Sequence, residues 1–349
     1  MQVGLVTGKG EISLVDMPQP EPQPGKAVVD IAYCGICGTD VHAYQSGAPY
    51  NPAICGHEWV GHVSAAGDGV SHVKDGDRVA IGVASACGSC PTCRRGDAAH
   101  CEMAFAGAIG VGPLAATHGG FASAICFDAS RLYHVPASLT DEQASLLEPA
   151  TVAVHALRRT PLNLGDSVVV LGAGPIGLLV LEAAKLSGAG TLILVEPEPH
   201  RRNLGATLGA DLCIDPTTGD LAEQISQFLS QRSAGTATSP DVVFECAGIP
   251  ATIGQSVELV RRGGVVSLVG VANQPANIDP GTWMIKEVRL VSSIAYTHED
   301  FEICKQLVAD KRLQVDQLHT RTVSLDQMDQ AFQILATNPS EVKILVDPR

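Results

Sequence analysis

The spacing of apolar residues changes character near the middle of the chain. Before about Ala150, short runs alternate apolar and polar positions, as in AVVDIAY (27–33), DRVAIGV (77–83) and ASAICF (122–127). Stretches rich in glycine and proline separate these runs. Period-two alternation broken by turn residues predicts short strands joined by long loops. The first half should therefore be a β-rich domain.

From Asp166 onward the apolar runs become continuous. The five predicted strands are SVVVLGAG (167–174), TLILVEP (191–197), DLCIDP (211–216), DVVFECAG (241–248) and GVVSLVG (264–270). Helical periodicity fills the gaps at residues 176–186, 201–208, 221–231 and 251–261. Continuous apolar strands alternating with helices predict a parallel sheet that is covered on both faces. This half should be a doubly wound α/β domain.

The tail returns to a mixed pattern. It predicts a helix at residues 301–311, another near 328–337 and a final strand at 342–346. These elements can complete the first domain, which gives one domain from residues 1–150 and 290–349 and a second from residues 151–289. A length of 349 residues fits this division, because one core rarely grows beyond about 250 to 300 residues.

Composition narrows the possible partners and the compartment. A formal net charge of -14 disfavours nucleic acid and anionic membrane surfaces, since both would repel the chain. We found no cationic leader and no apolar run near the roughly 20 residues that span a bilayer, so we expect a cytoplasmic protein that acts on small molecules. The 11 cysteines should then stay reduced, and clustered ones should bind metal.

The sequence GAGPIG follows a predicted strand and opens a predicted helix. Gly172, Gly174 and Gly177 have the GxGxxG spacing, in which glycines allow a tight turn, a close approach to pyrophosphate and close helix packing. With Pro175 and Ile176 between them, they predict a dinucleotide-binding turn; the alternative is a glycine turn that serves packing alone.

Glu196 ends the second strand of this half and is placed to bind the adenosine ribose diol. A carboxylate there favours NAD over NADP, because it repels a 2′-phosphate. His200, Arg201 and Arg202 lie close enough in sequence to offset that repulsion, and we count Arg201 among the cofactor-binding residues. NADP therefore remains possible.

Four cysteines lie close together in CGSCPTCRRGDAAHC, at positions 87, 90, 93 and 101. Two-residue gaps allow successive thiolates to turn toward one ion, and four sulfurs complete a tetrahedron. Cys87, Cys90, Cys93 and Cys101 therefore predict a closed, structural zinc site. An iron–sulfur cluster uses similar spacings, but no proline follows the last cysteine here.

A second set of potential metal ligands would leave one coordination position unfilled and therefore predicts an open site. Cys37 occurs in YCGICGTDVHAY, His57 and Glu58 occur in ICGHEWVGHV, and Glu148 occurs in LLEPATVAVHAL. A thiolate, an imidazole and one carboxylate would hold zinc and leave one position for water or substrate, which makes the ion a Lewis acid. Cys34 and Cys55 are better explained as buried packing residues.

CGICGTDVH, GHEWVGHV, the four-cysteine loop, EPATVAVHA and GAGPIG together resemble the zinc-dependent medium-chain alcohol dehydrogenases over nearly the whole chain. The similarity is greatest to the butanediol and sorbitol dehydrogenase branch. It implies a GroES-like catalytic domain with an inserted Rossmann domain, a homodimer or homotetramer, and two zinc ions per chain, one catalytic and one structural. Ala295 stands where the sorbitol branch has an arginine that binds polyol, which counts against a long polyol.

The resemblance also implies roles for individual residues. Thr39 would receive the proton of the alcohol and pass it through the cofactor ribose to His42. Asp40 would orient His57, as metal-bound imidazoles commonly donate their other N–H to a carboxylate. Glu58 is either a direct zinc ligand or a carboxylate behind the metal that approaches it transiently, and Glu148 binds directly or through water.

The expected reaction is hydride transfer between NAD and a secondary alcohol or diol whose hydroxyl is ionised on the open zinc site. One alternative is an NADPH-favouring carbonyl reductase of the same fold. The other is a non-catalytic sensor or scaffold that binds zinc and nucleotide, which would need neither Thr39 nor His42.

Overall fold

The computed structural model describes residues 1–338 and 340–349, which fall into two compact units. Unit 1 comprises Met1–Thr151, Ala295–Lys311 and Val315–Arg349, and unit 2 comprises Val152–Ile294 and Arg312–Gln314. Unit 2 is thus inserted in the sequence of unit 1. Helix α5 (Leu147–Arg159) begins in unit 1 and ends in unit 2.

Unit 1 is built around a sheet of seven strands. The strands of unit 1, inside and outside this sheet, are β1 (Gln2–Gly8), β2 (Glu11–Asp16), β3 (Lys26–Gly35), β4 (Glu58–Ala66), β5 (Arg78–Ile81), β6 (Ala124–Asp128), β7 (Leu132–His134), β14 (His319–Ser324) and β15 (Lys343–Asp347). The order in the large sheet is β14-β15-β3-β4-β5-β7, with β6 also paired to β3, and β1 and β2 form a separate hairpin. Strands from both ends of the chain therefore meet at β3.

Short helices connect these strands. They are α1 (Gly38–Ser46), α2 (Pro91–Arg94), α3 (Glu102–Ala108), α4 (Asp141–Ser145), α11 (His298–Ala309) and α12 (Met328–Thr337), with 3-10 turns at Pro52–Ile54, Ala98–His100, Ala129–Arg131, Asp316–Leu318 and Leu325–Gln327. The unit 1 core includes Trp59, Phe121, Phe127 and Phe332, each at most 1% exposed. The rings of Trp59 and Phe127 pack edge to face. This core fixes the start of β4.

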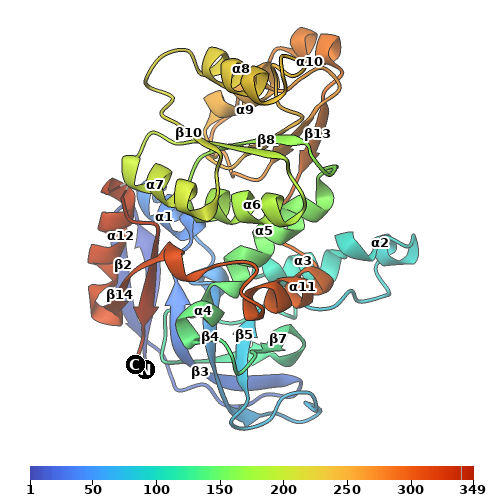
Figure 1. Cartoon of the computed structure of the whole chain (residues 1–349). Helices are drawn as coiled ribbons and strands as arrows, with labels where there is room; N and C mark the ends of the chain where they lie inside the picture. The colour runs from blue at the N-terminus through green and yellow to red at the C-terminus, as the bar shows by residue number, and fades with distance from the viewer. Residues whose placement is uncertain (339) are drawn as a thin grey trace. The chain divides into compact units, whose positions relative to one another are not determined.

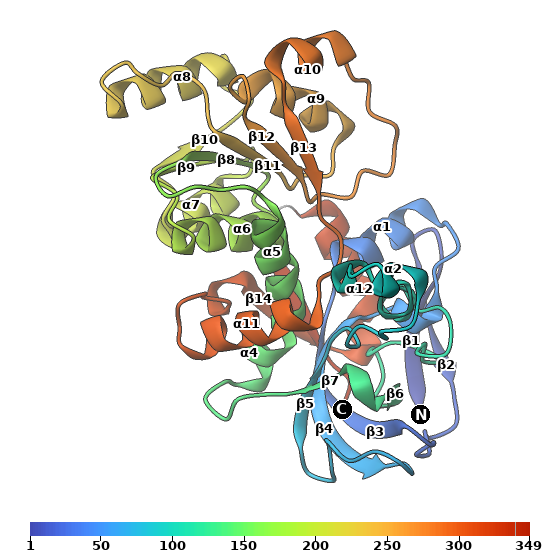
Figure 2. The same cartoon turned by 90° about the vertical axis from the view of Figure 1, so that its right-hand side faces the viewer.

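Unit 2 contains one sheet of six parallel strands. Its strands are β8 (Ser167–Leu171), β9 (Thr191–Val195), β10 (Leu212–Ile214), β11 (Val242–Glu245), β12 (Val265–Leu268) and β13 (Arg289–Ser292), in the order β10-β9-β8-β11-β12-β13. Its remaining helices are α6 (Pro175–Leu186), α7 (Pro199–Leu208), α8 (Leu221–Arg232), α9 (Pro250–Leu259) and α10 (Pro280–Lys286). Figures 1 and 2 show α6 and α7 on one face of this sheet and α8 and α9 on the other.

Burial explains the continuous apolar runs of unit 2. Every residue of β8 and β9 is buried, as expected for strands covered by helices on both faces. The strand order reverses between β8 and β11, which is where doubly wound sheets bind dinucleotides. The mixed sheet of unit 1 and the doubly wound parallel sheet of the inserted unit 2 match the predicted fold class, a GroES-like domain with an inserted Rossmann domain.

The helices of unit 2 begin close to their predicted positions, and α9 shows the clearest difference. It ends at Leu259 and not at residue 261, because Val260 is extended and the N–H of Arg261 donates to the Pro240 carbonyl. Among the described residues, no helix combines the length and the hydropathy needed to cross a membrane.

Candidate functional site

Cys37, His57 and Glu58 converge in unit 1. Their ligand atoms all lie within 4.8 Å of one another. Glu58 is 1% exposed, and Cys37 and His57 are partly buried. A thiol, an imidazole and a carboxylate at this separation match the ligand chemistry of zinc. The structure thus brings together three of the four residues that the sequence assigned to the open site.

The ends of secondary-structure elements place these side chains. Cys37 precedes the first turn of α1, where the Asp40 carboxylate accepts the Cys37 N–H at 2.9 Å. Glu58 is the first residue of β4, and it follows a turn in which Gly56 has a φ of 81°. A Cβ at Gly56 would lie 2.8 Å from the Phe121 ring, so both the turn and the packing require glycine.

The His57 ring is oriented by a carbonyl group. Nδ1 lies 2.8 Å from the Ile54 oxygen, whereas the nearest Asp40 oxygen is 3.9 Å away. Donation from Nδ1–H to Ile54 leaves the Nε2 lone pair free for a metal. The expectation that Asp40 accepts this hydrogen bond is therefore wrong for this structure.

Asp40 instead holds the surrounding loops together. Its Oδ1 accepts the hydroxyl of Tyr50 at 2.6 Å and the N–H of Gly56 at 3.2 Å. Burial raises the pKa of Asp40, and the same cause raises that of Tyr50, so the phenol remains a donor. Burial lowers the pKa of His57, but the negative charges of Cys37, Asp40 and Glu148 outweigh it and raise that pKa.

Lys343 completes the site, although the sequence analysis did not include it. Its ammonium, which is 2% exposed, donates to Glu58 Oε1 at 2.8 Å, to Glu58 Oε2 at 2.6 Å and to the Ile36 carbonyl at 2.9 Å. These three bonds use all three ammonium hydrogens. Burial lowers the pKa of Lys343, but the Glu58 charge raises it overall.

The sheet order explains how residues 285 positions apart form this pair. Glu58 lies on β4 and Lys343 on β15, and β3 runs between them. On β3, Gly35 pairs with Glu58 of β4 on one side and with Leu345 of β15 on the other. A Cβ there would lie 2.3 Å from Glu58 Oε2, so glycine leaves the space through which the carboxylate meets the lysine. A lysine inside the apolar run VKILV was the available sequence signal.

Glu148 lies near this group but outside the set of close ligand atoms. Burial and the neighbouring Glu58 charge raise its pKa to about 7, against the opposing effects of His57, Lys343 and a hydrogen bond with Tyr296. Tyr296, which is 9% exposed, is thus a hydrogen-bond partner of Glu148.

Thr39 and His42 follow Cys37 on α1. The Cys37 sulfur lies 3.7 Å from the Thr39 hydroxyl. Thr39 and His42 are both exposed residues. Partial desolvation of the imidazole lowers the pKa of His42. A neutral imidazole can accept a proton near neutral pH. Their side chains are thus available for proton transfer.

Cys34 and Cys55 pack in the core beside the site. They are at most 1% exposed, and their sulfurs contact the Gly35 and Gly4 carbonyls. Burial raises the pKa of both thiols. In the part of the chain that the structure describes, neither belongs to a group of metal-ligand side chains, in agreement with the packing interpretation.

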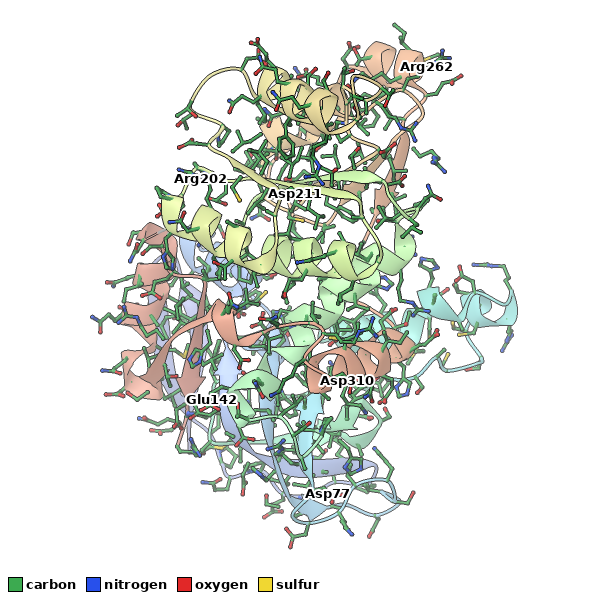
Figure 3. All side chains as sticks on the ribbon, in the orientation of Figure 1. Asp77, Glu142, Arg202, Asp211, Arg262 and Asp310 are labelled. Carbon is green, nitrogen blue, oxygen red and sulfur yellow. The ribbon has the colours of Figure 1, made fainter. Side chains whose placement is uncertain are left out.

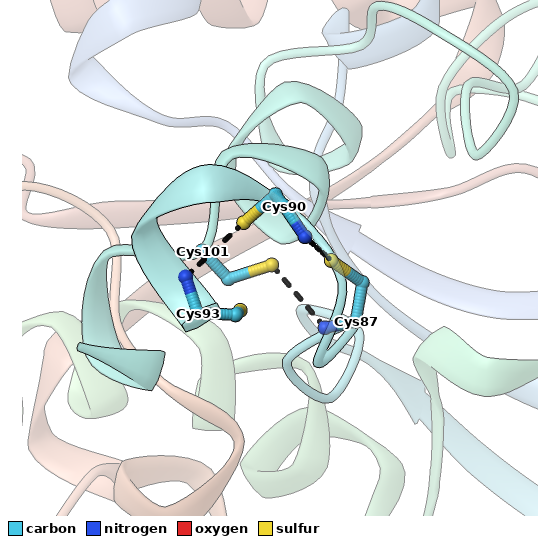
Figure 4. A group of neighbouring side chains, drawn as sticks. All are labelled: Cys87, Cys90, Cys93 and Cys101. Atoms are coloured by element: carbon cyan, nitrogen blue, oxygen red, sulfur yellow. Dashed lines mark hydrogen bonds between the residues drawn. The ribbon is translucent and has the colours of Figure 1, made fainter. Parts of the chain in front are cut away.

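The four-cysteine loop forms a separate group. The sulfurs of Cys87, Cys90, Cys93 and Cys101 lie within 4.8 Å of one another. Figure 4 shows backbone N–H groups directed at three of the sulfurs: Cys90 to Cys87, Cys93 to Cys90 and Cys87 to Cys101, at 3.3 to 3.4 Å. Such donors stabilise thiolates. The arrangement fits one ion with four sulfur ligands.

Hydrogen bonds favour the thiolate form of two cysteines in this loop, whereas desolvation raises the pKa of Cys93 to about 12. Hydrogen bonds from the Ser89 backbone and hydroxyl lower the pKa of Cys87 to about 6. The Cys93 backbone N–H lowers the pKa of Cys90, which precedes the first turn of α2. Cys101 occupies the same position before α3.

The glycine-rich turn of unit 2 has the conformation that its spacing predicts. Gly172 follows β8 with a φ of 96°, Gly174 caps α6, and Pro175 is its first residue. A Cβ at Gly177 would lie 1.9 Å from the Gly172 oxygen, which excludes any other residue. Ile176 lies within the first turn of α6. The helix N-terminus is therefore free to face a phosphate group.

Glu196 is connected directly to this turn. Its Oε2 accepts the N–H of Ala173 at 2.7 Å, and its Oε1 accepts the N–H of Glu198 at 3.0 Å. The carboxylate is 6% exposed at the end of β9. Each oxygen retains a second lone pair for a ribose hydroxyl.

The basic residues after Glu196 interact in part with neighbouring groups of the protein. Arg202, labelled in Figure 3, donates to the carbonyls of Glu196 and Pro197 and pairs with Asp215 at 3.1 Å. Burial lowers the pKa of Arg201, and the charges of Glu196 and Glu198 oppose this effect. Arg201 therefore lies beside the same carboxylate that was expected to bind ribose.

Comparisons with known proteins agree with both units. Residues 23–137 match the alcohol dehydrogenase GroES-like domain, and residues 175–310 match the zinc-binding dehydrogenase family. The (R,R)-butanediol dehydrogenase of Bacillus subtilis is 33% identical, and the match covers 97% of this chain and 97% of that protein. The sorbitol dehydrogenase of Halalkalibacterium halodurans is 31% identical and covers 98% of this chain and 97% of its own length.

Among solved structures, a zinc-binding dehydrogenase from Sinorhizobium meliloti bound to NADP superposes with a TM-score of 0.84. It is 31% identical and covers 99% of both chains. Sequence and structure agree, and the chain belongs to the zinc-dependent medium-chain alcohol dehydrogenase family, in the branch of the butanediol and sorbitol dehydrogenases.

Proposed function

We propose that this chain is a zinc-dependent dehydrogenase that transfers a hydride between a secondary alcohol or vicinal diol and NAD. The observation that carries the proposal is the convergence of Cys37, His57 and Glu58 within 4.8 Å in unit 1. Unit 1 supplies the metal and substrate chemistry, and unit 2 supplies dinucleotide binding. The butanediol and sorbitol relatives support this substrate class.

Cys37, His57 and Glu148 are the residues that we propose to hold the catalytic ion. Both oxygens of Glu58 accept bonds from Lys343, which favours a supporting position for Glu58 over direct ligation. Lys343 also balances charge, because three anionic groups would otherwise surround one divalent cation. When bound, zinc would supply Lewis-acid polarisation that lowers the pKa of an alcohol hydroxyl.

The remaining residues handle the proton and the cofactor. Thr39 accepts the proton released from the alcohol, and His42, whose pKa is lowered, passes it to solvent. Residues 172–177 bind the pyrophosphate, Glu196 binds the adenosine ribose and Arg201 lies beside it. Glu196 supports NAD, whereas a neighbour of known structure holds NADP, so an NADPH-favouring reductase is the second candidate.

A spectrophotometric panel tests the proposal. Diols, polyols and simple secondary alcohols are offered with NAD and NADP separately, and reduced cofactor is followed by absorbance. We expect a diol or secondary alcohol with NAD to give the highest kcat/KM. Preference for NADP would support the reductase, and absence of turnover in a zinc-loaded, NADH-binding protein would support the non-catalytic alternative.

Two further proposals accompany this function. The Cys87, Cys90, Cys93 and Cys101 group holds a second, structural zinc, so metal analysis should approach two ions per chain. The active form is a homodimer or homotetramer in the cytoplasm, which light scattering and cell fractionation test.

A further inference from the structure

Asn51 connects two segments of unit 1 that lie far apart in the sequence. Its Nδ2 donates to the Ile109 carbonyl at 3.1 Å and to the Gly110 carbonyl at 2.8 Å. Its Oδ1 accepts the N–H of Ala53 at 3.0 Å. The nitrogen can be told from the oxygen, because the two carbonyls require a donor and the Ala53 N–H requires an acceptor. The amide is thus a bridge to which the proposed reaction gives no role.

One side of the bridge leads to His57. The amide oxygen caps the short turn Pro52–Ile54. The Ile54 carbonyl at the end of this turn lies 2.8 Å from Nδ1 of His57 and orients the ring. A Cβ at Gly110 would lie 2.9 Å from the Ile54 side chain, so the segment after α3 is packed directly against the turn. The position of the Ile54 carbonyl therefore depends on where residues 109 and 110 lie.

The other side of the bridge leads to the four-cysteine loop through α3. The Cys101 sulfur accepts the N–H of Ala104 at 3.5 Å and caps the N-terminal end of this helix. The helix has seven residues, all of them described, and only Gly107 is buried. A helix of this length is not stable by itself in water, so its order depends on what holds its two ends. Cys101 holds one end, and Asn51 holds the segment after the other.

Metal binding in the loop would decide how firmly the first end is held. One ion bound to four sulfurs would tie Cys101 to Cys87, Cys90 and Cys93 at once. Without an ion, the Cys101 sulfur depends on hydrogen bonds such as those from the N–H groups of Cys87 at 3.3 Å and Ala104 at 3.5 Å. Sulfur is a weak acceptor. Loss of the ion would therefore loosen α3, and the bridge would transmit this change to the His57 turn.

We propose that Asn51 is a positioning residue that couples the four-cysteine loop to the His57 turn, so that metal in the loop strengthens metal binding at the open site. The inference rests on the two metal sites of the proposed function. Coupling between two binding sites is reciprocal, so metal at the open site strengthens binding in the loop by the same factor.

Competition titration of the full-length protein with a zinc chelator tests the coupling. Cys93→Ser, which empties the loop, should raise the zinc dissociation constant of the open site about tenfold, within the usual range for coupled sites. Asn51→Ser should raise the same constant about tenfold while the loop ion stays bound. Its hydroxyl can still accept the Ala53 N–H but is too short to bridge to Ile109 and Gly110.

The double variant separates coupling from a general loss of stability. Cys93→Ser combined with Asn51→Ser should bind zinc at the open site no more weakly than either single variant, because both changes interrupt the same connection. Independent effects would add and weaken binding about a hundredfold. Asn203→Ser changes an exposed asparagine on α7 of unit 2 and should alter neither dissociation constant.

A second comparison reads the coupling from the loop. Cys37→Ser empties the open site and should weaken zinc binding in the loop by the same factor, about tenfold. Asn51→Ser should abolish the difference between the loop constants measured with and without Cys37. This comparison decides the matter if Cys93→Ser does not fold.

An unchanged open-site constant in Asn51→Ser, or additive effects in the double variant, would overturn the coupling. Turnover of alcohol is measured on the same samples. Two coupled zinc ions without turnover would refute the proposed function and leave this inference standing. Failure of the unmodified protein to bind zinc at the open site would refute both.

Discussion

The two cysteine-bearing groups of unit 1 use different means to stabilise anionic ligands. In the loop of Cys87, Cys90, Cys93 and Cys101, backbone N–H groups from the same short segment point at sulfur. At Cys37, His57 and Glu58, the stabilising charge comes from Lys343, on a strand at the other end of the chain. The loop can therefore organise itself locally, whereas the open site depends on long-range packing.

The largest expected effect is on activity, which should depend on the group of Cys37, His57 and Glu58 and not on the four-cysteine loop. Cys37→Ser should reduce kcat/KM by on the order of 10³- to 10⁴-fold, because it removes a ligand of the metal that polarises the substrate. Zinc analysis of the same sample should show one ion lost per chain and the other retained. Turnover is measured by NADH absorbance.

The reciprocal variant provides the control. Cys93→Ser should release the loop ion, lower the thermal midpoint and leave turnover per remaining zinc ion near that of the unmodified protein. If Cys93→Ser abolished turnover in folded protein, the separation of structural and catalytic roles would be wrong.

The next effect concerns the buried ion pair. Lys343→Met should lower the free energy of unfolding by about 3–5 kcal/mol, because it leaves the Glu58 carboxylate buried without its counter-ion. Urea denaturation measures this change. Lys343→Arg retains the charge and should be less destabilising.

A double-mutant cycle tests whether the pair acts as a unit. Glu58→Gln combined with Lys343→Met should be less destabilised than the sum of the single variants. Strict additivity would show that the two side chains do not stabilise each other.

A smaller effect is expected from the proton path. Thr39→Val should reduce kcat about 10²-fold while zinc content stays unchanged, because the variant removes the hydroxyl that accepts the substrate proton. Thr39→Ser restores the hydroxyl and should recover most of the rate. Equal rates for the serine and valine variants would exclude Thr39 from proton transfer.

The smallest effect concerns thiol reactivity after zinc removal. With a pKa near 6, Cys87 should already be mostly thiolate at pH 7, so its alkylation by iodoacetamide should rise through about pH 6 and then level off. Cys126, whose pKa burial raises, should react roughly tenfold more slowly at pH 7 and keep accelerating above it. Mass spectrometry of the peptides measures both, and identical pH profiles would contradict the difference.

Prediction from the sequence succeeded where the interacting residues are close together in the chain. The spacing of Gly172, Gly174 and Gly177 is imposed by one turn, and the continuous burial of β8 and β9 leaves a direct trace in the apolar runs. The four cysteines likewise lie within one short segment. In each case the residues that interact are near neighbours in the chain.

It was incomplete where partners come from distant segments. The contact between Lys343 and Glu58 depends on strand order and on the missing side chain of Gly35, neither of which appears in local spacing. The assignment of His57 to Asp40 was wrong because a backbone carbonyl, that of Ile54, competes for the same hydrogen. Backbone acceptors have no signature in a side-chain pattern.

The placement of Lys343 has a consequence for biosynthesis. Glu58 emerges from the ribosome 285 residues before its counter-ion, and the whole of unit 2 is translated in between. A nascent chain can thus fold its nucleotide-binding unit while the carboxylate of the metal site still lacks its cation. The pair between Glu58 and Lys343 can form only after Lys343 has left the ribosome, when all of unit 2 has already been synthesised.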